Sequence, residues 1–265
     1  MKRVRNIFIS IVYVAYLLCR QLFCHNEKNM VYCTILFYHA IPDDKVIKFT
    51  KQMKILKQLT STIPLDYDGP YKKKVWYSIV TFDDAFKSII RNGLPEMSRL
   101  EIPFTVFIPA GHLGTNPGWL KNTGDENESE PILSIDELLG LPWELATFGS
   151  HSINHHNLKQ VDYEKACTEI IDSKKILELH LNREIRYFSF PYGAYDSTLI
   201  PCCLEAGYKQ IFTIIPEAPF EPLRNYVKGR IEVNLSDWTI EFILKILGGY
   251  GWKSHIRSMR AMMKN

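Results

Sequence analysis

The spacing of apolar positions changes regularly along the chain from residue 31 onward. Short runs of β-branched and aromatic residues, typical of strands, alternate with longer stretches in which apolar residues recur at helical spacing. This alternation predicts βα units on a mostly parallel sheet, and seven strands in one α/β domain favour a barrel. The predicted strands span residues 32–37, 78–82, 104–108, 146–149, 187–190, 209–213 and 231–233. The predicted helices span residues 49–59, 86–98, 135–140, 163–179, 198–206 and 238–247, with Asp162 as the N-cap of the fourth.

The remaining sequence is arranged around this single domain, which we place at residues 31–250. Residues 111–131 are rich in Gly, Asn, Asp, Glu and Pro, which predicts a surface loop after the third strand. Residues 251–265 form a short basic tail, and residues 1–28 form a basic and apolar N-terminal segment.

The N-terminal segment begins like a signal peptide, because basic residues precede an apolar run over 7–19, but no small-x-small cleavage site follows. As a helix this run reaches only ~20 Å at ~1.5 Å per residue, whereas the hydrocarbon core of a membrane is ~30 Å thick. Arg20 interrupts any extension of the run. We therefore expect residues 1–28 to associate with a membrane as a short or interfacial anchor, on a side that the sequence leaves open. The alternative is a helix buried against the domain.

Charge and cysteine content narrow the class of protein. The net charge of +3 arises from 32 basic and 29 acidic residues spread along the chain, which excludes an extended nucleic-acid-binding surface. The six cysteines show no metal-finger spacing, and the adjacent Cys202 and Cys203 are a poor basis for a disulfide framework. Cysteine usage therefore disfavours an oxidising compartment.

Reactive side chains follow four of the predicted strands. Barrel enzymes build their sites where strands end, and packing alone does not explain polar residues at four such ends. These positions are Tyr38-His39, Asp83-Asp84, Ser150-His151 and Pro191-Tyr192-Gly193.

Two of these positions predict a metal site. His151 and His155 are four residues apart, so on a helix or tight turn their imidazoles face one ion. The adjacent carboxylates of Asp83 and Asp84 would repel each other at the end of an apolar strand unless a cation lay between them. A helix N-cap near Ala85 would explain one of these aspartates but not both. Carboxylate and imidazole ligands suit Zn²⁺ best, and Co²⁺, Ni²⁺ or Fe²⁺ also bind such sites.

One carboxylate and two imidazoles leave open coordination positions, which is typical of a catalytic metal site. A bound metal activates water and polarises a carbonyl, so the reaction class is metal-assisted hydrolysis of an amide or ester. The second carboxylate is then free to take the proton from water. Backbone amides near Pro191, Tyr192 and Gly193 are candidate oxyanion donors, and His39 or His255 is the candidate acid for the leaving group.

Three ordered motifs give the chain a resemblance to the polysaccharide deacetylase superfamily, carbohydrate esterase family four. Residues 81–84 resemble its first motif, 149–155 its second and 188–193 its third. The resemblance covers residues 35–242 approximately and implies a distorted (β/α)7 barrel.

The resemblance also implies roles for individual residues. Asp83 corresponds to the catalytic base, and Asp84, His151 and His155 correspond to the metal ligands. Ser152 matches the hydroxyl residue that shapes the second motif. The third motif, Pro191-Tyr192-Gly193, corresponds to one wall of the groove and to the backbone donor for the oxyanion.

The chain departs from the familiar enzymes of the family at two points. Ser189 stands where the third motif usually has an arginine, and the C-terminal Leu-x-His motif is not found. A circularly permuted branch, similar to the poly-N-acetylglucosamine deacetylases, shares both departures and supplies its acid from a Tyr-His pair. Tyr38-His39 matches that pair and makes His39 the better acid. Arg230, in Gly229-Arg230-Ile231, is the candidate replacement for the missing arginine, with Arg186 as its rival.

The implied activity is removal of acetyl groups, N-acetyl rather than O-acetyl, from an oligosaccharide, polysaccharide or lipid-linked glycan. Two alternatives stay open. One is hydrolysis of another non-peptide amide, and the other is a catalytically silent carbohydrate-binding protein tethered to a membrane.

Overall fold

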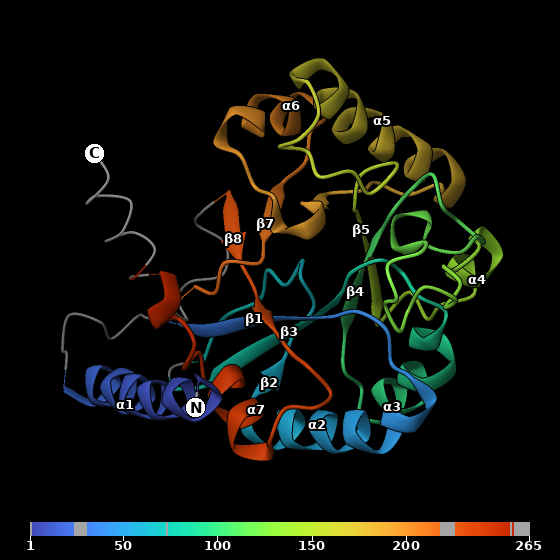
Figure 1. Cartoon of the computed structure of the whole chain (residues 1–265). Coiled ribbons are helices and arrows are strands. Elements are labelled where there is room, and N and C mark those ends of the chain that lie inside the picture. Colours follow the sequence, from blue (N-terminus) through green and yellow to red (C-terminus); the bar gives the residue numbers. More distant parts are fainter. Residues whose placement is uncertain (1, 24–30, 73, 218–225, 255, 257–265) are drawn as a thin grey trace.

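All strand pairs that the structure describes in the sheet of this protein are parallel. A computed structural model describes residues 2–23, 31–72, 74–217, 226–254 and 256. Within them the strand order is β8-β7-β6-β5-β4-β3-β1-β9, and β2 pairs with β3 at the side (Figure 1). The strands are β1 (Tyr32–Tyr38), β2 (Ser61–Thr62), β3 (Trp76–Phe82), β4 (Phe104–Ile108), β5 (Ala146–Ser150), β6 (Tyr187–Ser189), β7 (Gln210–Thr213), β8 (Val227–Gly229) and β9 (Ile231–Glu232).

One segment of chain joins the two edges of this sheet. β8 pairs with β7, where Thr213 lies opposite Gly229, and β9 pairs with β1, where Leu36 lies opposite Ile231. Only Arg230 separates β8 from β9. The two short strands therefore occupy one strand position, or stave, of the barrel, between β7 and β1. The sheet therefore curls into the predicted seven-stave α/β barrel, whose interior and outer faces are both covered. Accordingly, every residue of β1 and β4 is buried.

Helices surround the strands (Figure 1). Asp162 caps α5 as predicted, because its side chain accepts a hydrogen bond from the backbone N–H of Lys165. The helices of the barrel are α2 (Val46–Leu59), α3 (Leu94–Arg99), α4 (Ile135–Leu139), α5 (Tyr163–Leu181), α6 (Ile200–Glu205) and α7 (Thr239–Ile246).

The predicted helix over residues 86–98 is present over most of its length, but it starts later than expected and its first part is π-helical. The chain forms a π-helical turn over Ile89–Gly93 before α3 begins at Leu94. Asp84 and Ala85 have φ angles of 68° and 55°, a left-handed conformation that does not continue into an α-helix. The helix start is thus displaced by the backbone turn that carries Asp84.

The N-terminal helix α1 (Lys2–Phe23) packs against α7, next to which it lies in Figure 1. It is longer than the apolar run predicted and packs one of its faces on the domain, which was the alternative interpretation. Tyr32 donates a hydrogen bond to the carbonyl of Leu17, and Trp252 donates to the hydroxyl of Ser10. Among the described residues, no helix is both long and apolar enough to span a membrane.

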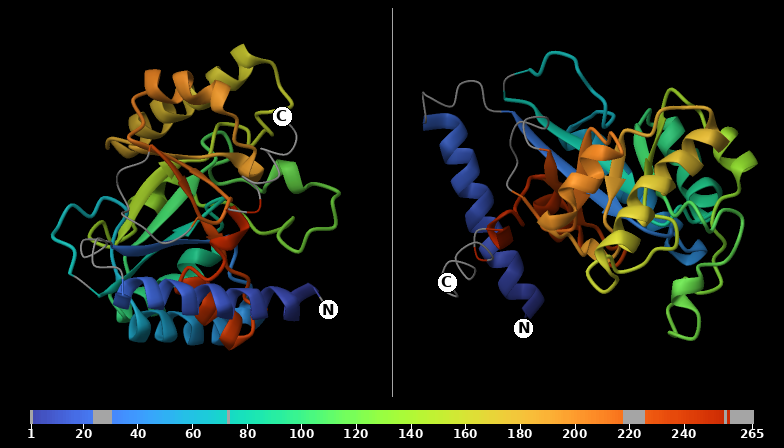
Figure 2. Two further views of the ribbon diagram at one scale, coloured as in Figure 1. Left: turned by 90° about the vertical axis from the view of Figure 1, so that its left-hand side faces the viewer. Right: turned by 90° about the horizontal axis from the view of Figure 1, so that it is seen from above.

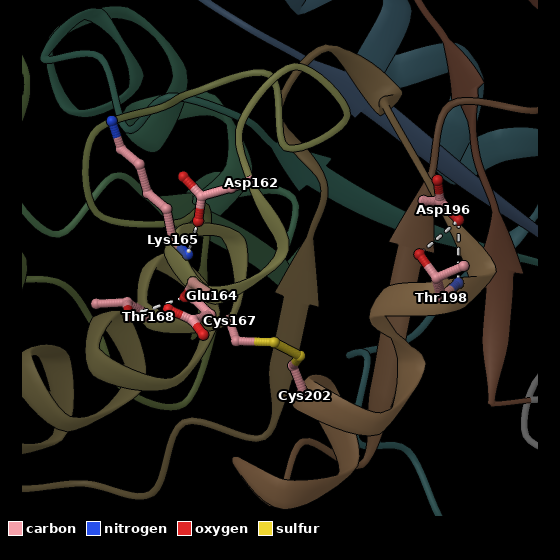
Figure 3. Close-up of a disulfide and its surroundings, with 8 residues drawn as sticks. All are labelled: Asp162, Glu164, Lys165, Cys167, Thr168, Asp196, Thr198 and Cys202. Carbon is pink, nitrogen blue, oxygen red and sulfur yellow. Dashed lines mark hydrogen bonds between the residues drawn. A yellow bond between two sulfur atoms is a disulfide. The ribbon is translucent and has the colours of Figure 1, made fainter.

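A disulfide joins two helices, contrary to the expectation from cysteine spacing. Cys167 of α5 and Cys202 of α6 are bonded with their Cα atoms 5.3 Å apart (Figure 3). Cys203 is buried and unpaired. Adjacent cysteines on a helix point in different directions, so one reaches α5 while the other packs in the core.

Candidate active site

The ends of the strands surround one cavity of about 480 Å³. The residues predicted from β1, β3, β5 and β6 meet there, although they are far apart in the sequence. Its lining includes His39, Asp83, Asp84, His151, His155, Tyr192 and Gly193. The structure therefore brings the strand-end residues together as the barrel rule predicts.

Asp84, His151 and His155, here called the metal triad, point their ligand atoms at one position. A carboxylate oxygen of Asp84 lies 3.0 Å from Nε2 of His155 and 3.5 Å from Nε2 of His151. All three side chains are buried, and their ligand atoms lie within 4.8 Å of one another. Nδ1 of His151 lies 2.7 Å from the carbonyl oxygen of Ser189, which orients Nε2 toward the shared position.

The charge states of the metal triad suit a divalent cation. Burial lowers the pKa of His151 to about 4, so this imidazole is neutral and free to coordinate at neutral pH. Burial alone would raise the pKa of Asp84, but the neighbouring histidines outweigh it and hold the pKa well below its usual range. Oδ1 of Asp84 is buried without a hydrogen-bond partner among the described residues. A cation at the triad would satisfy that oxygen, so these residues fit a metal.

Asp83 has a different neighbour. Its two carboxylate oxygens each accept a hydrogen bond of 2.7 Å from the guanidinium of Arg230, whose side chain is fully buried. Burial would raise the pKa of Asp83, yet the charge of Arg230 lowers it overall. Asp83 is therefore an anion held in one orientation, with lone pairs left for a proton.

Arg230 is fixed from several sides. It also donates to the hydroxyls of Ser189, at 2.6 Å, and Thr81, at 3.0 Å. Its guanidinium lies over the rings of Phe37 and Phe107, at 4.8 and 5.0 Å from their centroids. Ser189 is the position at which the familiar enzymes carry arginine, so this cation reaches Asp83 from another strand.

The third motif forms a strained turn. Tyr192 has a φ of 57°, and a Cβ atom on Gly193 would approach Ile214 to 2.1 Å, so only glycine fits there. Pro191 has no N–H, and the N–H of Gly193 donates to the carbonyl of Phe190 at 2.9 Å. The N–H of Tyr192 is thus the backbone donor that this turn can offer to an oxyanion.

The second motif turns sharply to present His155. Ser152 and His155 have φ angles of 66° and 55°, and the Ser152 hydroxyl accepts a hydrogen bond from the N–H of His155. Buried Glu169, on α5, accepts hydrogen bonds of 2.9 and 2.8 Å from the N–H groups of Ile153 and Asn154. Its other oxygen accepts from the Asn154 amide at 2.7 Å and lies 3.1 Å from Nδ1 of His156. Glu169 therefore ties the ligand turn to the helix behind it.

Comparison with known proteins identifies the family. Residues 68–211, more than half of the chain, match the sequence model of the polysaccharide deacetylases. The chain belongs to the polysaccharide deacetylase family. The match includes the three motifs but ends before Arg230 and begins after His39.

Several relatives of this deacetylase-family chain are known. A poly-β-1,6-N-acetyl-D-glucosamine N-deacetylase of Staphylococcus aureus is 28% identical over 193 residues, which cover 68% of this chain and 60% of the relative. The chain thus spans less than two thirds of that protein. Among solved structures, IcaB from Ammonifex degensii (TM-score 0.66, 21% identity, covering 83% of this chain and 97% of that one) shares the fold. So does the Streptococcus pyogenes deacetylase PplD in complex with acetate (TM-score 0.65, 20% identity, 83% and 99%).

The cavity also contains a residue that the sequence did not reveal. Trp119, in the loop after β4, stacks on the ring of His155 with centroids 4.1 Å apart. On the far side of Trp119 and Tyr192 lies a second, more open hollow, lined also by His112, His156 and Gln160. Loop residues follow no periodic pattern, so the sequence predicted this loop but not its part in the site.

Of the two alternative residues, only Arg186 lies among the described residues, and it does not line the cavity. Arg186 is nearly half exposed at the start of β6 and pairs with Glu184 at 2.7 Å. His255, the other candidate acid, lies outside the described residues, as does most of the basic tail.

Proposed function

We propose that this chain is a metal-dependent N-deacetylase of a polymer that contains N-acetylhexosamine, with poly-N-acetylglucosamine as the first substrate to test. The observation that carries the proposal is a buried carboxylate, Asp83, which is paired with Arg230 and lies directly beside the metal triad. Supporting it are the family and the named activity of the staphylococcal relative.

Within this proposal each residue of the cavity has a task. When bound, the metal activates water and polarises the acetyl carbonyl. Asp83 takes the proton that the attacking water loses, and the N–H of Tyr192 donates to the oxygen that gains negative charge. His39 delivers a proton to the nitrogen as the carbon–nitrogen bond breaks. The products are acetate and a free amine on the sugar.

The shape of the site favours a chain-like substrate. The hollow beyond Trp119 and Tyr192 continues the cavity past His155, so neighbouring sugar units have room on that side of the metal. Flat aromatic rings are suited to pack against sugar rings. We infer that units on both sides of the acetylated sugar contribute to binding, whether the glycan is free or linked to a lipid.

Zinc is the metal we propose, because imidazole nitrogens and a single carboxylate oxygen match its preferred ligands. The test is acetate release from N-acetylglucosamine oligomers of increasing length by metal-stripped protein, reconstituted with Zn²⁺, Co²⁺, Ni²⁺ or Fe²⁺. Activity should return with metal and should rise with oligomer length. Protein that binds one metal per chain and yet releases no acetate from these oligomers, from O-acetylated glycans or from lipid-linked glycans would refute the proposal.

A further inference from the structure

The helix α1 has two apolar faces, and only one of them packs against the rest of the described chain. Inward-facing positions recur at spacings of three and four residues, as in a packed seam. Four of them are buried, namely Ile7, Ser10, Val14 and Leu17. Arg3 at one end of this face pairs with Glu241 of α7 at 2.6 Å. α1 is therefore an integral part of the folded domain.

The opposite face of α1 is apolar but exposed. The right view of Figure 2 places this helix at the edge of the molecule. Phe8 is 67% exposed and Val4 58%. The other large apolar side chains that are exposed on the helix are Ile11, Val12, Tyr16 and Leu18. Together with Phe8 and Val4 they form what we call the outer stripe.

Charge distinguishes the kinds of partner that this stripe could meet. Between Lys2 and Phe23 the sequence has four basic residues and no acidic residue. Lys2 and Arg5 lie at the N-terminal end and Arg20 near the C-terminal end. A second copy of this chain, packed stripe to stripe, would bring like charges together in either direction. A surface with negative charge would attract both ends of the helix.

We propose that the outer stripe of α1 binds the surface of a membrane that contains anionic lipids, with the helix lying parallel to the membrane plane. The apolar side chains enter the boundary between headgroups and acyl chains, while the basic residues contact the phosphates. The inner face stays packed on the barrel, so the catalytic domain is held directly against the membrane without a spanning segment.

The test compares vesicle binding by two matched double variants of the full chain. Phe8→Glu with Val12→Glu places two carboxylates in the outer stripe. Ile47→Glu with Leu179→Glu makes the same charge change at residues that are 84% and 81% exposed on α2 and α5. Binding is measured by co-sedimentation with phosphatidylcholine vesicles that contain either no anionic lipid or one third phosphatidylglycerol.

Wild type and the control variant should bind the anionic vesicles, and the outer-stripe variant should bind at least tenfold more weakly with an unchanged melting temperature. Neutral vesicles should bind less wild-type protein. Equal binding by both variants, or no binding by wild type, would overturn the proposal. So would a wild-type dimer in light scattering that the outer-stripe variant alone dissociates, because a second copy would then cover the stripe.

Discussion

Replacing Arg230 with alanine would leave the carboxylate of Asp83 buried without its cation. Both oxygens of Asp83 accept hydrogen bonds from Arg230, and the Asp83 side chain is only 4% exposed. Burial raises the pKa of this carboxyl and the positive charge of Arg230 lowers it. Removing Arg230 therefore takes away the strongest influence that opposes burial. We expect the pKa of Asp83 to rise in the variant.

The size of this effect follows from the charge separation. Two unit charges about 4 Å apart attract by ~4 kcal/mol at an effective dielectric constant of ~20, which corresponds to ~3 pKa units. Water that enters the space left by the guanidinium will solvate the Asp83 carboxylate and offset part of this lost attraction. We therefore expect the pKa of Asp83 to rise by at least ~1 unit. Together with the loss of orientation, turnover at neutral pH should fall more than tenfold, or by at least ~1.4 kcal/mol of transition-state stabilisation.

The assay is the pH dependence of acetate release, measured beside metal content. A base must be deprotonated to act, so the acidic limb of the kcat/KM profile should move to higher pH in Arg230→Ala. The shift should be smaller in Arg230→Lys, which keeps a positive charge. Metal content should stay at the wild-type level, because the recorded hydrogen-bond partners of Arg230 are Thr81, Asp83 and Ser189 and none is a metal ligand.

Arg186→Ala is the matched control, because this exposed arginine pairs with Glu184 outside the cavity. It should leave both turnover and the profile unchanged. If Arg230→Ala retains wild-type turnover and an unshifted acidic limb, Arg230 does not hold the base and the reasoning fails.

Three further predictions concern the same cavity. Alanine at any member of the metal triad should remove most bound metal, whereas Asp83→Asn should keep the metal and lose activity. Metal analysis and acetate release, measured on the same variants, test this prediction. Near-normal turnover in Asp83→Asn would contradict it. Glu169→Ala should weaken Zn²⁺ binding ~10- to 100-fold in a calorimetric titration, because the turn that carries His155 loses its hydrogen bonds to Glu169. Exposed Glu164→Ala on the same helix should leave Zn²⁺ affinity unchanged. Equal affinities in the two variants would show that Glu169 does not position the ligand turn. The pKa of His151 is about 4 in the fold and ~6.5 when unfolded, so the unfolded chain binds more protons between these values. The metal-free protein should therefore lose up to ~3 kcal/mol of stability as pH falls from 6.5 to 4. In urea unfolding, stability should fall more steeply with decreasing pH in wild type than in His151→Gln, and exposed His180→Gln, the control, should keep the wild-type slope.

Much of the barrel was predictable because its strands are buried on both faces. Such strands read as short apolar runs, and the prediction for β4 agrees with the structure at both ends. β2 and β8 were missed, because their sequences, Ser-Thr and Val-Lys-Gly, contain too few apolar residues to form a recognisable run. The last predicted strand likewise appears as β9 alone, because Arg230 divides the closing stave.

The metal triad could be placed from the sequence because its residues follow strands whose ends must meet. Arg230 was chosen for its position before the last strand, and the structure places it against Asp83, while its effect on catalysis stays a prediction. Contacts that depend on how separate helices and loops pack could not be foreseen. Trp119 reaches His155 from an irregular loop, and Cys167 meets Cys202 only because α5 and α6 lie side by side (Figure 3).

The segment that closes the barrel, from β8 through Arg230 to β9, determines what an incomplete chain can do. A fragment that ends at residue 211, where the family match ends, contains all three motifs and the complete metal triad. It lacks the stave that joins β7 to β1, and with it the cation that holds Asp83. The same segment thus closes the barrel and supplies the cation that pairs with the proposed base, Asp83. We expect hydrolysis to begin only when the last stave is in place, so catalytic activity would report on complete folding of the chain where metal content would not.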